Sequence, residues 1–200
     1  MDDTSKTVIG AIAKMAVQQH ERHAIATVDH LWRESHGTQL TYGELWYCAH
    51  SVSAMLVQDY GVQRGQRVLL LLPAAPAVWH TVALLGCQAA GAVPIIVDTT
   101  AVMKSADAVD SFDVFLLSLL ARTRARVVVS CSSIRRQRRK WPSDAAVHDA
   151  DADWLLLDAL LKFKQVRQAL RTEPLQSAVR AAPQDAAMLV PSRMTSDVVT

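Results

Sequence analysis

The sequence contains few cysteines, and no two of them lie close together. Three cysteines, at positions 48, 87 and 131, are spread over 200 residues without a CxxC spacing. Such a pattern argues against a disulfide framework and against a cysteine-based zinc site, and it fits a reducing compartment. We therefore expect no metal ligands in this chain and a cytoplasmic location.

The sequence also lacks an excess of one charge and any long apolar run. The formal net charge at pH 7 is +2, which predicts no strong attraction to nucleic acid or to an acidic membrane. No stretch reaches the ~18 uninterrupted apolar residues that a membrane-spanning helix needs. The polar start at residues 1–6 is not followed by the apolar run of a secretory signal. We expect neither a nucleic-acid partner nor a membrane association.

What the sequence does contain is typical of a globular α/β protein. Hydrophobic residues make up 50% of the chain and charged residues 20%, a balance that differs from that of disordered chains. The length suits one sizeable core, or a domain and a half at most. No internal repeat is visible.

The first part of the chain predicts a helix and a short strand. Residues 5–23 have the spacing of an amphipathic helix whose apolar side carries Val8, Ile12, Met15 and Ala16. Residues 24–28 are expected to form a short strand. The segment His20–His23 contains a His-Glu pair, but its histidines are not at the i and i+4 positions of a zinc-protease motif. We interpret it as a solvated helix end.

A second helix is predicted from its start and stop signals. Thr41 and Glu44 have the spacing of a capping box, in which each side chain accepts a hydrogen bond from an otherwise unpaired backbone N–H. Gly61 supplies the stop. The residues expected to be buried recur at helical spacing and are Leu45, Cys48, Val52, Met55 and Leu56.

A β-α-β unit is predicted next. Residues 67–72 are mostly an unbroken apolar run, as in a parallel strand that is buried on both faces, and Pro73 ends it. Pro76 is well placed to open a helix, which Gly91 closes. Residues 93–97 form the second strand. The buried stripe of the connecting helix is expected to be Val78, Val82, Leu85 and Ala89.

The remaining elements continue the alternation of strands and helices. We predict a helix at about 108–122, a strand at 126–130, a strand running into a helix at 154–161, and a last strand at 186–190. Residues 162–180 also favour a helix, which Pro174 interrupts. The predicted fold class is therefore α/β, with a mostly parallel sheet and flanking helices.

Residues 131–153 have the composition of a weakly structured basic loop. Five charges occur among residues 135–140. Such a cluster can be a nuclear-import or nucleic-acid patch, but aromatic residues are not interleaved with it, so a solvated loop is the favoured interpretation. Cys131 at the start of this segment could be a nucleophile. No histidine is placed to activate it, so a small residue at a strand end is favoured instead.

Two motifs, in this order and at this spacing, point to a family. The first is the segment Leu40-Thr41-Tyr42-Gly43-Glu44-Leu45, and the second is Gly91-Ala92-Val93-Pro94-Ile95-Ile96-Val97-Asp98. Residues 62–68, with Arg64 and Gly65, lie between them. From Ala24 onward the chain resembles the opening of an adenylate-forming (AMP-dependent synthetase/ligase) domain. The alternative is some other α/β fold, because each motif alone is only a capped helix start or a turn into a strand.

The resemblance implies a domain division and a chemistry. Residues 1–23 would be a helical lead-in, and residues 24–200 would be an incomplete N-terminal subdomain of the adenylate-forming fold. The family joins ATP and a carboxylate into an acyl-adenylate and pyrophosphate, with magnesium. Its adenine-binding residues, its metal-linked glutamate and its mobile C-terminal domain would correspond to positions beyond residue 200. Both early motifs are scaffold elements in that family, so the resemblance implies no catalytic residue here.

The family's phosphate-binding loop corresponds to residues 191–200. By this resemblance, Ser192, Thr195 and Ser196 are what remains of the phosphate-binding loop. Ser192 and Thr195 match hydroxyl positions of the family's loop. Arg193 and Ser196 stand where glycines are expected. Glycines let backbone amides approach a triphosphate. Asp197 adds a negative charge that repels phosphate, and no lysine follows within the 200 residues. The alternative interpretation is a frayed polar tail.

A narrower similarity concerns residues 86–95, which resemble the corresponding stretch in the fatty-acyl-AMP-ligase-like domains of Disco-interacting proteins. Those domains tolerate a glycine-poor loop. The leading hypothesis is a truncated adenylate-forming domain that is inactive alone, binds no cofactor by itself, and pairs with a polypeptide that supplies the missing C-terminal part. The alternative is a non-catalytic protein-interaction module on an α/β scaffold.

Overall fold

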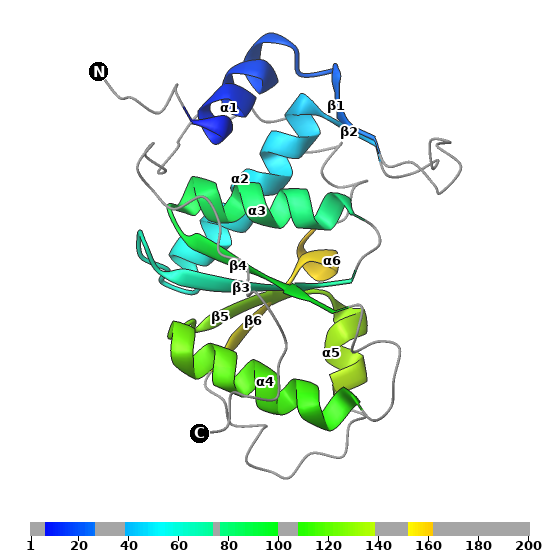
Figure 1. Cartoon of the computed structure of the whole chain (residues 1–200). Helices are drawn as coiled ribbons and strands as arrows, with labels where there is room; N and C mark the ends of the chain where they lie inside the picture. The colour runs from blue at the N-terminus through cyan, green and yellow to red at the C-terminus, as the bar shows by residue number, and fades with distance from the viewer. Residues whose placement is uncertain (1–6, 27–38, 74–76, 100–107, 139–151, 162–200) are drawn as a thin grey trace.

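The computed structural model describes residues 7–26, 39–73, 77–99, 108–138 and 152–161. Its centre is a four-stranded sheet with the order β4-β3-β5-β6, in which every neighbouring pair is parallel. Helices cover both faces of this sheet: α2 and α3 lie on one side, and α4 and α5 on the other (Figure 1). The structure is therefore the α/β fold with a parallel sheet that the sequence predicts.

The strand β3 (Arg67–Leu72) is central because it is apolar on both faces. Val68, Leu70 and Leu72 belong to the core under α2 and α3, whereas Leu69 and Leu71 belong to the core under α4. This strand pairs residue by residue with β4 (Val93–Asp98) and with β5 (Val127–Ser130). The prediction that the strands at 67–72 and 93–97 run parallel, either adjacent or one apart, is confirmed: the two strands are direct neighbours.

The helix α2 (Tyr42–Gln58) begins at the predicted capping box. The Thr41 side chain accepts from the N–H of Glu44, and the Glu44 carboxylate accepts from the N–H of Thr41 at 3.0 Å. The helix ends before Gly61, whose φ is 62°. All the residues predicted to be buried are buried except Met55, which is partly buried at the edge of the core.

The helix α3 (Val78–Ala90) packs closely on α2. A Cβ at Gly86 would lie 2.5 Å from Cγ1 of Val52 and 3.1 Å from the backbone oxygen of Ala49, so only glycine fits this crossing. The predicted stripe of α3 is buried. Gly91 ends the helix in the left-handed conformation, with φ 71°, as the sequence predicts. Pro76 lies outside the described residues.

The N-terminal helix α1 (Val8–Gln18) is shorter than predicted, and its buried side includes the predicted Ala16 and, in part, Ile12, but not Val8. Thr7 caps it by accepting from the N–H of Gly10 at 3.0 Å. The buried side carries Ile9, Ala13 and Ala16, whereas Val8 is 65% exposed. The predicted stripe was therefore wrong at Val8, because the i, i+4, i+7 set that faces α2 starts one residue later.

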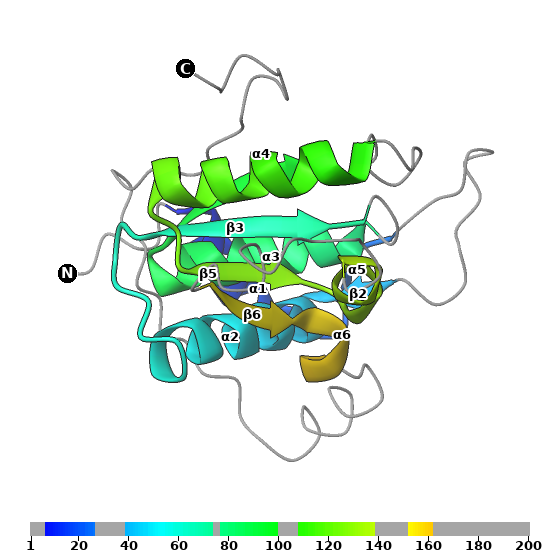
Figure 2. The same ribbon diagram turned by 90° about the horizontal axis from the view of Figure 1, so that it is seen from below.

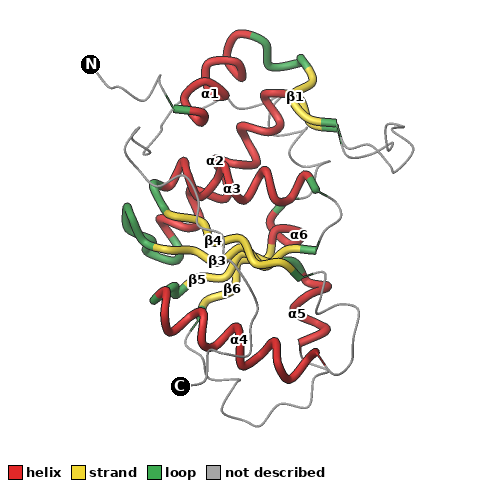
Figure 3. The backbone as a smooth tube through the Cα atoms, in the orientation of Figure 1, coloured by secondary structure: helices red, strands yellow, loops and turns green. Residues whose placement is uncertain are grey.

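A small two-stranded sheet joins this helix to the rest of the fold. The strand β1 (His23–Ile25) pairs antiparallel with β2 (Leu40–Thr41). It begins one residue before the strand predicted for 24–28, and residues 27 and 28 lie outside the described part. Figure 3 shows this pair of strands apart from the main sheet.

The opposite face carries α4 (Ala108–Thr123) and α5 (Ser132–Arg138). The first matches the predicted helix. The second corrects the prediction of a loop at 131–153, because the basic residues through Arg138 are helical. Ile134 is buried against Leu69 and Val128, and this long-range packing stabilises a segment whose local composition predicts no helix.

The sheet ends with β6 (Asp153–Leu156), which runs directly into α6 (Leu157–Leu160). This confirms the predicted strand that continues into a helix. The predicted helix at 162–180, the strand at 186–190 and the loop at 191–200 lie outside the described residues. Among the helices that the structure describes, none combines the length and the apolar character that crossing a bilayer requires.

Candidate functional site

The carboxyl ends of the parallel strands define the first place to look for a site. Figure 2 shows β3, β5 and β6 side by side, with their arrowheads at the same edge of the sheet. Ligands of open α/β sheets bind outside this edge. Thr99, Ser130 and the start of α5 lie here within the described chain.

Two hydroxyl groups at this edge tie the strand ends together. Thr99 Oγ1 donates to the carbonyl oxygen of Leu72 at 2.8 Å, and Ser130 Oγ donates to that of Leu71 at 2.7 Å. Both bonds are buried and both end on β3. Each bond removes the cost of an unpaired buried hydroxyl. These hydroxyls fix the shape of the edge, and their protons are committed to the backbone.

The start of α5 is held by a residue 26 positions further along the chain. Asp158 Oδ1 accepts from the backbone N–H of Ser132 at 2.8 Å and from its hydroxyl at 3.1 Å. A carboxylate at a helix N-terminus satisfies unpaired N–H groups and complements the helix dipole. Asp158 thus caps α5 from α6 and adds to the stability that the burial of Ile134 gives this helix.

A shallow, open cleft of ≈ 490 Å³ lies beside this contact. Arg135, Arg136, Ser132, Leu156 and Asp158 line it. Arg136 Nε donates to the carbonyl oxygen of Ser132 at 3.2 Å, which keeps this guanidinium over the first turn of α5. Guanidinium groups are suited to carboxylates and phosphates, so the arginine side of this cleft can bind an anionic group. The Ser132 hydroxyl in the same cleft donates to the Asp158 carboxylate that caps α5.

The cysteines are structural in this fold. Burial, with a smaller contribution from Glu44, raises the pKa of Cys48 to about 12, and burial raises the pKa of Cys87 to about 12. Both thiols are therefore protonated at neutral pH and unreactive. Cys131 is buried, and its sulfur lies 2.9 Å from Ser133 Oγ. Its place at the end of β5 fits the interpretation as a small strand-end residue.

The next candidates are the potential metal ligands and the residues of the predicted phosphate loop. Within the described ranges, no three His, Cys, Asp or Glu side chains lie close enough together to hold a metal ion. His20 and His23 are exposed, as predicted, but they do not form a helix end: α1 ends at Gln18, and His23 is the first residue of β1. The phosphate-loop residues Ser192, Thr195 and Ser196 lie outside the described residues, so their geometry stays a prediction.

Sequence reasoning missed the contact between Asp158 and Ser132. Nothing local marks it, because an aspartate in the first turn of a short helix is common and its partner is remote. The Ser130 hydroxyl carried a weak signal, since it is a polar residue that follows three valines at the end of a buried strand. A polar group buried there requires a partner, and β3 supplies it.

The comparisons with known proteins agree with this fold. Residues 13–191 match the family described as AMP-binding enzyme. Among solved structures, a fatty acyl-adenylate ligase from L. pneumophila in complex with acyl adenylate and pyrophosphate has a TM-score of 0.61 at 17% identity, over 90% of this chain and 27% of its own. No curated protein matches the chain.

Two further structures have the same arrangement. A fatty acyl CoA synthetase from Mycobacterium tuberculosis has a TM-score of 0.62 at 20% identity, over 94% of this chain and 33% of its own. The protein VinN, in complex with 3-methylaspartate, has a TM-score of 0.60 at 22% identity, over 90% of this chain and 42% of its own. The chain thus spans about a quarter to two fifths of the length of these structures. Since the family match covers most of its residues, the chain belongs to the AMP-binding enzyme family.

Proposed function

We propose that this chain is the N-terminal part of an adenylate-forming domain and that it makes no acyl-adenylate alone. The observation that carries the proposal is the family match over residues 13–191, together with a share of only 27% of the L. pneumophila ligase. The described elements build a sheet and its helices, and the hydroxyls at its carboxyl edge are committed to the backbone. The described residues therefore serve as the scaffold on which a phosphate loop is mounted.

The loop sequence supports inactivity of the chain alone. Arg193 and Ser196 stand at glycine positions of the family's loop, and Asp197 adds a negative charge. Phosphate chemistry depends on positioned donors and electrostatic stabilisation. Side chains at positions that need a close backbone approach remove donors, and a carboxylate beside them opposes a triphosphate. We propose Ser192, Thr195 and Ser196 as the remaining loop contacts.

The proposal includes a partner that completes the site. The remainder of the domain would come from a separate polypeptide or from further sequence, and ATP and magnesium would bind only to the completed domain. Fatty acids are the first carboxylates to test, because several similar structures are fatty acyl-adenylate ligases. The proposed location is the cytoplasm.

The test is complementation by a polypeptide that carries the remaining segments. The two chains are purified together and incubated with ATP, magnesium, a fatty acid and hydroxylamine, which traps an acyl-adenylate as a hydroxamate. Hydroxamate formed by the pair but by neither chain alone supports the proposal. Association of the two chains without hydroxamate, over a panel of fatty and amino acids, contradicts it.

The second candidate is a non-catalytic interaction module that uses the same scaffold. The glycine-poor loop at residues 191–200 favours it. A self-sufficient module should be monomeric, silent to a hydrophobic dye and sharply cooperative in unfolding. An incomplete enzyme should expose apolar surface, bind the dye and associate. Size-exclusion chromatography with light scattering, together with the dye assay, distinguishes the two.

A further inference from the structure

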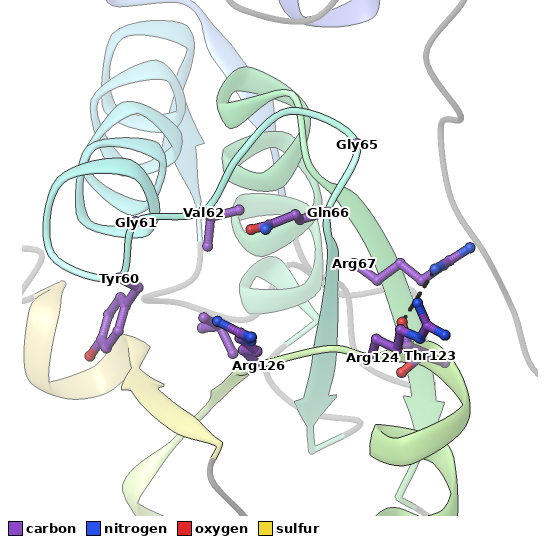
Figure 4. A pocket seen from close by; sticks show the side chains of 10 residues that line it. Tyr60, Gly61, Val62, Gly65, Gln66, Arg67, Thr123, Arg124 and Arg126 are labelled. Carbon is purple, nitrogen blue, oxygen red and sulfur yellow. Dashed lines mark hydrogen bonds between the residues drawn. The ribbon is translucent and has the colours of Figure 1, made fainter.

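A second cavity lies at the opposite edge of the sheet, where the strands begin. Its volume is ≈ 380 Å³, and it is lined by the chain that follows α2, by the start of β3 and by the turn from α4 into β5. Figure 4 shows the side chains around it. The cavity therefore lies away from the carboxyl edge and belongs to neither the cleft beside α5 nor the predicted phosphate loop.

The charge of this cavity is positive. Arg67, Arg124 and Arg126 are among its ten lining residues, and no aspartate or glutamate is among them. All three arginines are exposed to solvent. In Figure 4 the side chains of Arg67 and Arg124 lie at the end of the cavity far from Tyr60. The side chain of Arg126 lies between this end and Tyr60. We call this cavity the arginine pocket.

One of these guanidinium groups is held in place. Arg67 Nη1 donates to the carbonyl oxygen of Thr123 at 3.3 Å, a bond between β3 and the end of α4. Guanidinium presents five N–H donors in a rigid plane. The bond to Thr123 uses one of them and keeps the guanidinium at the end of α4, beside Arg124.

Three residues that line the arginine pocket have positive φ angles. Gly61, Gly65 and Arg124 have φ values of 62°, 80° and 53°, and all three line the pocket. Within the described part of the chain, Arg124 is the only residue other than glycine with a positive φ. Glycine would adopt this conformation without strain. An arginine kept there at a cost points to a function for its side chain.

Stabilisation of a helix end explains only part of the cluster. Arg67 and Arg124 lie beside the last carbonyl groups of α4, where cations complement the helix dipole. Arg122 already supplies a cation in this last turn. The dipole does not account for Arg126, which lies past the helix at the start of β5. The three arginines are therefore better explained by a common anionic ligand.

Two acidic residues, Asp59 and Asp153, act on the Tyr60 end of the arginine pocket. Burial, and then Asp153 and Asp59, raise the pKa of Tyr60, against a smaller lowering by Arg135. The Tyr60 hydroxyl donates to the carbonyl oxygen of Trp154 at 3.3 Å. An anion would be repelled at this end and attracted at the other, between Arg67 and Arg124.

We propose that the arginine pocket binds a phosphate group, either as the free ion or as the ester of a small molecule. Bidentate, charge-assisted hydrogen bonds from guanidinium to phosphate oxygens are the interaction that this geometry favours. Free phosphate and phosphate esters share this chemistry. The site is independent of the proposed adenylate-forming activity, because none of its residues lies at the carboxyl edge of the sheet.

The test is an NMR titration of the ¹⁵N-labelled 200-residue chain with inorganic phosphate and, separately, with glycerol 3-phosphate. Saturable shifts of the amides of Gly61, Gly65 and Thr123 are expected at constant ionic strength. Saturation by both compounds assigns the pocket to phosphate esters, and saturation by phosphate alone assigns it to the free ion. Both support the proposal, whereas shifts that stay linear with concentration overturn it.

Three variants separate a built site from general positive charge. Arg124→Gly and Arg126→Gln should each weaken binding about tenfold, the loss of one charged hydrogen-bond pair. Arg122→Gln removes the same charge outside the pocket and should change binding less than twofold. Arg124→Gly also relieves backbone strain, so its unfolding temperature should not fall. Equal weakening in all three variants, or unchanged binding in Arg124→Gly, overturns the proposal.

Discussion

The two faces of the sheet are specified in different ways. On the face of α2 and α3, the capping box and the helix-ending glycine are both local signals in the sequence. On the face of α4 and α5, the helix α5 depends on Asp158, 26 residues away, and on the burial of Ile134. The comparison teaches that a local sequence pattern predicts the first face, whereas long-range contacts decide the second.

The largest effect is expected where the two helices of the first face cross. Gly86→Val should lower the free energy of unfolding by about 3 kcal/mol or more, because the valine side chain would overlap Val52 in a closely packed core. Chemical denaturation measures the loss. Ala121→Val, at an exposed position of α4, is the control and should cost only about 0.5 kcal/mol. Similar losses in both variants would contradict the close crossing.

Gly91→Val should cause the next largest loss of unfolding free energy, about 2 kcal/mol, because a β-branched residue is strained at φ 71°. Gly91→Asn tolerates this conformation better and should lose about half as much. The unfolding free energies of the two variants provide the measurement. An unchanged midpoint in Gly91→Val would contradict the left-handed helix end.

Alkaline pH should destabilise the first face through its two buried thiols. Burial raises their pKa to about 12 in the fold, against 9.0 for an exposed cysteine. Above pH 9 the unfolded chain loses these protons while the folded chain keeps them. The stabilisation is thus complete below pH 9 and is lost as pH rises towards 12. The expected slope is about 1.4 kcal/mol per pH unit for each thiol.

Denaturation between pH 8 and pH 11 measures this slope. The double variant Cys48→Ala and Cys87→Ala should show a shallower decline than the unmodified chain, although cavities lower its stability at every pH. Parallel pH curves for the two proteins would show that the thiols do not carry the effect.

The smallest effects are expected at the N-terminal caps of two helices, α2 on the first face and α5 on the second. Thr41→Ala removes a local capping box and should cost about 1 kcal/mol in global stability. Asp158→Ala removes the remote cap of α5 and should cost about 0.5 kcal/mol, since the contact is exposed. Amide hydrogen exchange distinguishes them: the second variant should lose protection in α5 alone. Loss of protection throughout the sheet in Asp158→Ala would contradict the comparison.

The sequence predicted the scaffold well and its functional edge poorly, for physical reasons. The run at residues 67–72 is apolar on both faces, so only a central parallel strand suits it. The capping box and Gly91 set helix ends through bonds within a few residues. Ser132 finds its partner only when β5 and β6 pair, which no local pattern reveals. The phase of α1 was wrong at Val8 because α2, rather than intrinsic periodicity, selects the buried side.

Pyrophosphate exchange into ATP by the purified chain tests the central claim most directly. Our proposal makes the described residues a scaffold and holds that the proposed loop contacts alone are too few for catalysis. The account therefore predicts no exchange above the buffer background with any of a panel of fatty and amino acids. Ser192→Ala with Thr195→Ala is the matched control and should give the same background. Carboxylate-dependent exchange by the chain alone, abolished in this control, would contradict the account.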